Sequence, residues 1–210
     1  RCDLISLHTP LVKKGTHTTY GLIGLEFLQS LSRGAVLLNT CRGGVVSEKD
    51  IGKFYQERND LNLVFDVWEN EPNVASEIVK TAKIATPHIA GYSMESKFAA
   101  VNSLRKSFAA NFDLPIVNRE LIDIDASESH CEFKEGNSLK TILGQEFSLK
   151  QISNDFKSAV NDCQDLNYFD KARKQLISRR EYRGALMDDS ALGEFQKKIL
   201  AQLEMSMSKS

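Results

Sequence analysis

Short apolar runs separated by stretches of helical periodicity fill the first half of the chain. The runs at 4–7, 35–39 and 63–65 are apolar almost throughout, and a shorter one follows at 83–85. An uninterrupted apolar run is typical of a strand in a parallel sheet that is covered on both faces. We therefore expect four parallel strands with helical crossovers, which make half of a doubly wound α/β sheet.

The intervening segments carry helix signals. Leucines recur once per turn over 24–31, and Gly34 follows as a stop. Ser47 with Asp50 three residues later predicts a helix start, and this helix should run to about residue 58. A short helical segment precedes the fourth strand. A long helix is expected over 94–111, with an apolar stripe that includes Phe98, Val101, Leu104 and Phe108 beside Arg105.

Beyond this helix the pattern changes. Alternating polarity at 121–125 predicts a strand, 127–137 is polar and loop-like, and apolar residues recur at near-helical spacing over 152–166. We expect three parts: a ligand-binding α/β domain over 1–92, a long connecting helix over 93–111, and a smaller α+β domain over 112–210.

Composition and charge narrow the class of protein. Hydrophobic residues make up 41% and charged residues 26% of the 210 residues, as in folded globular proteins. The net charge of −1 gives no bulk attraction to nucleic acid or to an acidic membrane. No apolar run approaches the roughly 18 to 20 residues that cross a bilayer, and no signal-peptide pattern is present. These features favour a cytoplasmic protein without nucleic-acid or membrane partners.

The spacing of the cysteines and histidines does not predict a metal site. The four cysteines are scattered and include no C-x-x-C pair, so we expect reduced thiols and neither a disulfide scaffold nor structural zinc. His8, His17 and His130 lack metal-ligand spacing. The basic stretch over 171–183 contains a single aromatic residue, Tyr182, and the net charge is near zero, which favours a solvated helix face or a dimer contact over a nucleic-acid site.

Three polar residues of complementary chemistry follow three successive predicted strands. They are Arg42, Glu71 and His88. Ligands bind at the carboxyl ends of the strands in open parallel sheets, so these loops should converge. The Arg42 guanidinium suits a carboxylate, and two glycines after it let a ligand approach closely. Glu71, if it reaches His88, would orient the imidazole as a general base. Together the three residues indicate oxidation of an alcohol, with a hydride leaving for a nicotinamide.

The motifs at these strand exits resemble those of the D-isomer-specific 2-hydroxyacid dehydrogenases. The matching segments, in order and spacing over residues 1 to about 100, are LHTPL at 7–11, NTCRGGVV at 39–46, DVWENEP at 66–72 and TPHIAG at 86–91. The resemblance implies a Rossmann-like domain that binds NAD. It also implies that Arg42, Glu71 and His88 are the catalytic trio. The NAD contacts implied by the resemblance are Thr9, Thr40, Cys41, Arg42, Asp66 and Gly91.

Within the family, several features resemble one subfamily that acts on a phosphorylated 2-hydroxy acid. They are Cys41 before Arg42, Trp68 in place of Phe or Tyr, and Tyr92 after Gly91. Tyr92 is then implied as a substrate contact alongside Arg42. Segments 169–173 and 179–181 resemble the C-terminal dimerisation region of this subfamily, which implies a homodimer.

One family feature is absent from the 210 residues. No glycine-rich G-x-G-x-x-G turn, which would seat the NAD pyrophosphate on a helix N-terminus, occurs in the sequence. The chain also begins at Arg1, directly before a predicted strand. We therefore expect a fragment whose first half lies upstream, and we expect these residues alone to be inactive.

Three functions remain open at this point. The first is an NAD-dependent dehydrogenase acting on the phosphorylated 2-hydroxy acid of the subfamily. The second is another D-2-hydroxyacid dehydrogenase, of the phosphoglycerate or glycerate type. The third is a noncatalytic NAD-sensing scaffold of the corepressor type. A catalytic role for the Cys41 thiol is disfavoured, because no base within reach is visible in the sequence.

Overall fold

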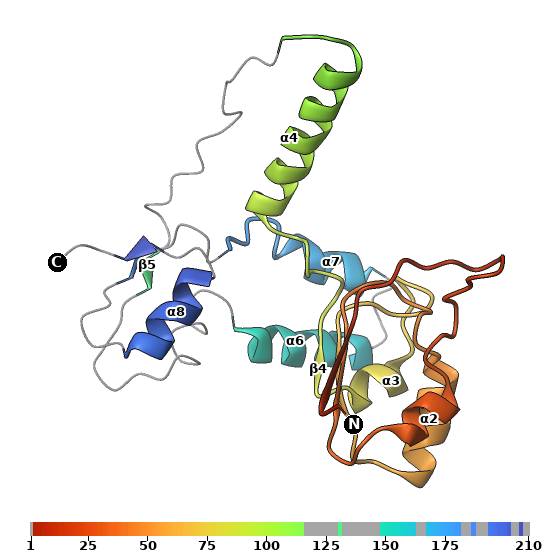
Figure 1. Ribbon diagram of the computed structural model, residues 1–210. Helices are drawn as coiled ribbons and strands as arrows, with labels where there is room; N and C mark the ends of the chain where they lie inside the picture. Colours follow the sequence, from red (N-terminus) through yellow and green to blue (C-terminus); the bar gives the residue numbers. More distant parts are fainter. Residues whose placement is uncertain are drawn as a thin grey trace. The chain divides into compact units, whose positions relative to one another are not determined.

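The computed structural model (Figure 1) describes residues 2–115, 130–131, 148–162, 167–181, 186–187, 193–202 and 206–207. The chain forms two compact units. Unit 1 combines Arg1–Ala90 with Leu149–Gln175, and unit 2 combines Gly91–Ser148 with Leu176–Ser210. No helix in the described ranges is both long and apolar enough to span a membrane.

A four-stranded parallel sheet is the centre of unit 1. Its strands, in spatial order, are β1 (Leu4–Leu7), β2 (Val36–Asn39), β3 (Asn62–Phe65) and β4 (Ile84–Ala85). The crossovers are the helices α1 (Leu25–Ser30), α2 (Glu48–Glu57) and α3 (Ser76–Thr81). The Ser47 hydroxyl accepts a hydrogen bond from the Asp50 N–H at 3.2 Å, which confirms the predicted start of α2. The predicted parallel α/β architecture is confirmed.

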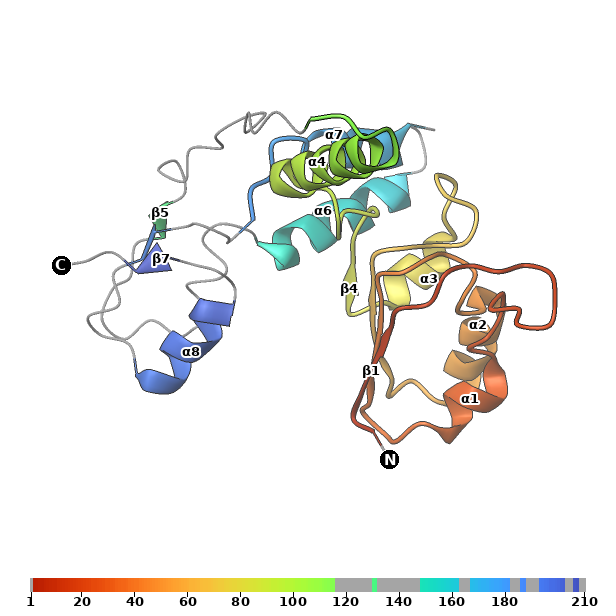
Figure 2. The ribbon, with the colours of Figure 1, turned by 45° about the horizontal axis from the view of Figure 1, so that its top comes forward.

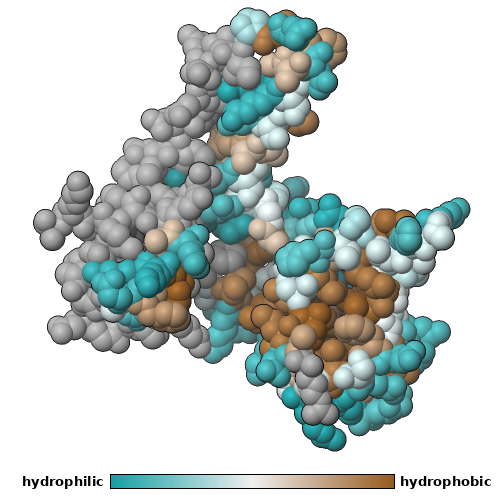
Figure 3. Space-filling view, viewed as in Figure 1, coloured by the Kyte–Doolittle hydropathy of each residue, from teal (hydrophilic) through white to brown (hydrophobic). Residues whose placement is uncertain are grey.

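The sheet is covered unequally on its two faces. Leu37, Leu63 and Phe65 are buried, whereas Leu4 on the opposite face is 60% exposed. Figure 3 shows hydrophobic side chains gathered on the surface of this unit. In β2 and β3, half-buried residues on this opposite face alternate with fully buried residues on the other. The strand order follows the sequence order, so right-handed crossovers place all three helices on one face.

Two later helices join unit 1 across the edge of the sheet. They are α6 (Leu149–Asp162) and α7 (Tyr168–Lys174) (Figure 2). The Ser153 hydroxyl accepts a hydrogen bond from the Ala85 N–H at 3.0 Å, which satisfies a donor on edge strand β4. Phe156 packs beside Trp68, with 6.0 Å between ring centroids. The expected domain over 112–210 is therefore divided, because part of it completes the core of unit 1.

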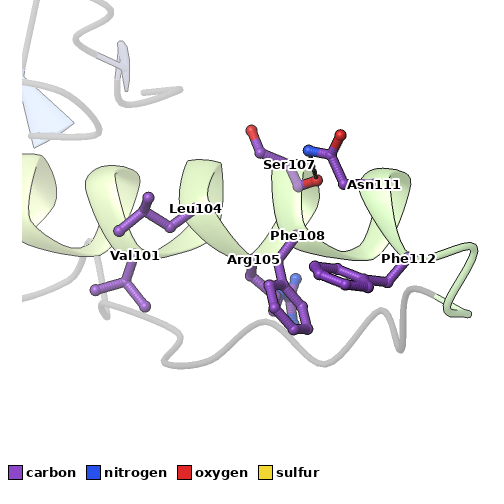
Figure 4. A pocket seen from close by; sticks show the side chains of 7 residues that line it. All are labelled: Val101, Leu104, Arg105, Ser107, Phe108, Asn111 and Phe112. Carbon is purple, nitrogen blue, oxygen red and sulfur yellow. Dashed lines mark hydrogen bonds between the residues drawn. The ribbon is translucent and has the colours of Figure 1, made fainter.

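Unit 2 begins with the expected long helix, α4 (Met94–Asn111). The Ser93 hydroxyl caps it by accepting a hydrogen bond from the Ser96 N–H at 3.0 Å. The predicted apolar stripe is present, but Leu104 is 72% exposed. An open pocket of about 810 Å³ lies along this face (Figure 4), lined by Val101, Leu104, Arg105, Ser107, Phe108, Asn111 and Phe112.

Short elements make up the remainder of the described part of unit 2. Strands β5 (His130–Cys131), β6 (Leu186–Met187) and β7 (Ser206–Met207) form a three-stranded parallel sheet, and α8 (Glu194–Gln202) lies between β6 and β7 in the chain. The predicted loop at 127–137 thus contains a strand. The predicted strand at 121–125 lies outside the described residues.

Candidate active site

Loops at the carboxyl ends of the four parallel strands hold the predicted site residues of unit 1. Thr9 follows β1, Arg42 follows β2, Asp66 and Glu71 follow β3, and His88 follows β4. Parallel strands end at one edge of a sheet, so these loops meet there. This arrangement confirms the placement predicted from the strand exits, and the side-chain contacts described next show which residues interact.

Glu71 and His88 form a direct side-chain pair. Glu71 Oε2 lies 2.7 Å from His88 Nδ1. Glu71 Oε1 accepts a hydrogen bond from the Trp68 N–H at 2.8 Å, so both carboxylate oxygens are used. A carboxylate accepts hydrogen bonds, so we assign the imidazole proton to Nδ1. His88 Nε2 is then left with a lone pair that can accept a proton from a substrate hydroxyl.

The backbone of His88 adopts an unusual conformation. Its φ of 55° lies in the left-handed region, which residues other than glycine adopt at an energetic cost. The His88 N–H donates to the Asp66 carbonyl at 2.7 Å, which holds this conformation at the end of β4. A backbone conformation of this kind persists where the surrounding structure fixes it, and such positions cluster at functional sites.

Asp66 fixes the loop that carries His88. Its carboxylate is 3% exposed and accepts hydrogen bonds from Thr86 Oγ1 at 2.5 Å and from the N–H groups of Ile89 and Ala90, both at 2.8 Å. Burial raises the pKa of the Asp66 carboxyl, and these hydrogen bonds oppose the rise. In the described residues, Asp66 therefore acts as a positioning residue. Its contact with NAD stays a prediction.

Asn39, which the sequence analysis did not single out, shapes the loop of Cys41 and Arg42. Asn39 Oδ1 accepts hydrogen bonds from the Cys41 N–H at 3.2 Å and from the Cys41 thiol at 3.0 Å. Asn39 Nδ2 donates to the Arg42 carbonyl at 3.4 Å. An amide oxygen is not a base that could activate the Cys41 thiol. A buried polar residue at the end of an apolar strand is the signal that could have identified Asn39.

The Arg42 side chain is exposed, and its Nη1 donates to the Cys41 carbonyl at 2.6 Å. The following residue explains how this loop meets the loop of Glu71. A Cβ added to Gly43 would lie 1.7 Å from the Trp68 carbonyl oxygen, so a side chain there would force the loops apart. The structure thus packs the Arg42 loop against the Trp68–Glu71 loop. The carboxylate-binding role of Arg42 stays a prediction.

Two buried or half-buried glutamates that the sequence analysis missed join α2 to the same loop. The Glu69 N–H donates to Glu48 Oε1 at 2.7 Å, and the Glu48 N–H donates to Glu69 Oε1 at 3.1 Å. Glu48 is 8% exposed. Acidic residues are rarely buried, but a single sequence gives no sign that Glu48 faces inward.

Gly91 and Tyr92 belong to unit 2 and are described within it. A Cβ added to Gly91 would meet no atom within 4 Å, so the space beside it is open. The Tyr92 carbonyl accepts a hydrogen bond from Arg179 Nε at 3.1 Å, and Lys97 Nζ lies 3.9 Å from the centroid of the Tyr92 ring. The proposed contacts of Gly91 with NAD and of Tyr92 with substrate stay predictions, as does that of Thr40.

Sequence comparisons identify the family. Residues 1–90 match the D-isomer specific 2-hydroxyacid dehydrogenase, NAD binding domain. A curated protein of Shewanella sp. (strain DB6705), named erythronate-4-phosphate dehydrogenase, is 34% identical over 203 residues, which cover 86% of this chain and 71% of that protein. The chain belongs to the D-isomer-specific 2-hydroxyacid dehydrogenase family.

Other members of this 2-hydroxyacid dehydrogenase family are longer than the chain. The erythronate-4-phosphate dehydrogenase of Shewanella violacea is 35% identical, and the match covers 87% of this chain and 51% of that protein. The chain thus spans about half the length of this relative and of the erythronate-4-phosphate dehydrogenase of Shewanella halifaxensis. Among solved structures, NAD⁺-bound 3-phosphoglycerate dehydrogenase of Entamoeba histolytica is 29% identical, with a TM-score of 0.46 and coverage of 58% of this chain and 39% of that one.

NAD is the cofactor of this dehydrogenase domain. The structure offers one independent sign of a ligand at the sheet edge: Thr9 Oγ1 is buried without a hydrogen-bond partner in the described part of the chain. An orphaned hydroxyl after β1, beside the loop after β2, fits a polar ligand at the carboxyl ends of these strands. Thr9, Thr40 and Cys41 are residues of unit 1 that would contact NAD there, and these contacts stay predictions.

The buried Glu48 carboxyl should make the free energy of unfolding depend on pH. Burial raises the pKa of Glu48 from the usual 4.5 to about 7, the hydrogen bond from Glu69 opposes this, and the charges of Glu69 and Glu71 add to it. The folded protein therefore binds an extra proton between pH 4.5 and 7. The stability contributed by neutral Glu48 is fully present below the unfolded-state pKa and is lost as pH rises through the folded-state pKa.

We expect Glu48→Gln to remove this dependence, because an amide does not ionise. Chemical denaturation at pH 5 and pH 8 should show a smaller loss of unfolding free energy in the variant, by up to about 3 kcal/mol. Exposed Glu57 lies on the same helix, so Glu57→Gln serves as the control and should leave the pH dependence unchanged. Equal pH dependence in Glu48→Gln and the wild type would contradict the raised pKa.

Proposed function

We propose that the protein oxidises 4-phospho-D-erythronate to 2-oxo-3-hydroxy-4-phosphobutanoate with NAD, in the biosynthesis of pyridoxal 5′-phosphate. The main structural support for His88 as a general base is the 2.7 Å contact between Glu71 Oε2 and His88 Nδ1. The choice of substrate is supported by the names of the relatives, which are erythronate-4-phosphate dehydrogenases at 32–35% identity. It is also supported by the subfamily-like residues Cys41, Trp68 and Tyr92.

His88 is the general base in this proposal. Nε2 accepts the proton of the substrate C2 hydroxyl, while Glu71 holds the Nδ1 proton and stabilises the imidazolium that forms. NAD, when bound, would supply the acceptor for the hydride that leaves C2, and the product would then carry a 2-oxo group. The proton and the hydride together account for the two electrons and two hydrogens lost by the alcohol.

Arg42 binds the substrate in this proposal. A guanidinium forms two parallel hydrogen bonds with a carboxylate, which would set the substrate carboxylate beside C2. In the structure Arg42 is exposed and bonded to its neighbouring carbonyl, so its guanidinium can be redirected without breaking an ion pair with a described residue. Tyr92 is proposed as a second substrate contact.

His88→Ala tests the role of the base. In the full natural protein we expect kcat to fall by about 10²-fold or more, because the step loses its proton acceptor. Steady-state kinetics with NAD and 4-phospho-D-erythronate measures this. His17→Ala, at an exposed position outside the site, is the matched control and should keep wild-type turnover. Near-normal turnover by the His88 variant would remove this residue from the base role.

Competing substrates separate the proposed activity from that of other family members. We expect kcat/KM of the full natural protein to be at least about 10²-fold higher for 4-phospho-D-erythronate than for 3-phosphoglycerate or glycerate. A site that hydrogen-bonds the polar groups of its own substrate rejects an analogue that leaves polar groups of the site without a partner. A higher kcat/KM for 3-phosphoglycerate or glycerate would be consistent with the proposed dehydrogenase reaction but would contradict the proposed substrate. No turnover of any of them with NAD would favour a noncatalytic NAD-sensing scaffold.

The proposal includes a homodimer and a cytoplasmic location. Cys2 and Cys41 are free thiols, as suits a reducing compartment. The support for a dimer is the resemblance of 169–173 and 179–181 to a dimerisation region. Phe169, however, is buried in the core of unit 1, so a dimer contact must use other side chains of that segment.

A further inference from the structure

We propose that Glu48 and Glu69 form a positioning clasp, which fixes the Trp68–Glu71 loop to the start of helix α2 and thereby sets the Glu71 carboxylate on His88. The inference rests on the proposed function, since it concerns the same general base. Glu48 and Glu69 form no hydrogen bond with the side chain of Glu71 or His88 among those described. They act on this pair through the Trp68–Glu71 loop.

The clasp consists of two reciprocal hydrogen bonds. Each glutamate accepts the backbone N–H of the other, at 2.7 Å for Glu48 Oε1 and 3.1 Å for Glu69 Oε1. Glu48 is the first residue of α2, where the first N–H groups of the helix have no partner within it. The Glu69 carboxylate satisfies one of them. The two bonds join a rigid helix end to a loop that lacks a helix or strand of its own.

The position of the Glu69 backbone affects His88 through Trp68 and Glu71. Glu69 directly follows Trp68, whose N–H donates to Glu71 Oε1 at 2.8 Å. The other oxygen of Glu71 contacts His88. The Trp68 side chain is fixed separately, because its Nε1–H donates to the Thr86 carbonyl at 2.9 Å. A shift of the Glu69 backbone would therefore move the N–H that orients the Glu71 carboxylate.

Glu48 is buried for a group of its charge, and this supports a role for its oxygen. A buried carboxyl costs free energy unless hydrogen bonds compensate, and burial raises its pKa accordingly. An apolar residue at this position would avoid that cost but would leave the Glu69 N–H without an acceptor. The acceptor oxygen, and not the charge, is what the clasp requires.

Three variants of the full natural protein test the clasp. Glu48→Ala removes the acceptor, and we expect kcat for 4-phospho-D-erythronate to fall by about 10- to 100-fold with KM for substrate and NAD within about 2-fold, because misplacement of a base slows the chemical step. Glu48→Gln keeps an acceptor oxygen and should restore kcat. Glu57→Ala, an exposed glutamate on the same helix, should match the wild type.

A spectroscopic readout separates positioning from general destabilisation. The Nδ1 proton of His88, held by Glu71, should give a downfield ¹H NMR signal in the wild type and in Glu48→Gln. It should weaken or move upfield in Glu48→Ala under conditions where circular dichroism shows a folded protein. If Glu48→Ala does not fold, Glu69→Ala decides, since it removes a half-buried side chain and the second bond of the clasp.

The outcomes distinguish the clasp from the function on which it rests. Wild-type kcat and an unchanged His88 signal in both Glu48→Ala and Glu69→Ala would overturn the clasp, as would an equal loss of kcat in Glu48→Ala and Glu48→Gln. A His88→Ala variant that turns over as fast as the wild type would overturn the proposed function instead.

Discussion

The buried Asp66 carboxylate is the interaction on which the geometry of the site depends. It lies at the end of β3 and accepts three hydrogen bonds from the segment that follows β4. An unpaired carboxylate at this depth would be costly, so the segment around His88 must fold onto it. This requirement fixes His88 in a left-handed backbone conformation and places its ring where Glu71 reaches it.

The loop after β3 receives support from three directions. Glu48 binds it from the start of α2, Gly43 lets the loop after β2 approach closely, and Phe156 of α6 packs on Trp68. The last contact gives the later part of the chain a role in the core of the NAD-binding unit. Preorganisation of this kind reduces the motion that a catalytic group must lose before it reacts.

The sequence predicted the strands and the strand-exit residues well, because apolar runs and the motifs at their ends are local signals. Glu71 and His88 were placed together correctly on that basis. The unequal burial of the two faces of the sheet was not predicted, because no single segment of the sequence determines the order of the strands. Glu48, Asn39 and Thr86 were missed as well, since their roles arise from contacts between loops that periodicity does not reveal.

The central claim is that Glu71 activates His88, and the rate of hydride transfer in Glu71→Gln tests it most directly. The amide keeps an acceptor for the Trp68 N–H but loses the charge that stabilises the imidazolium. In single-turnover experiments with the full natural protein and 2-deuterated substrate, the account predicts a transfer rate lower by about 10²-fold, with affinity for NAD unchanged. A rate equal to that of the wild type would contradict it.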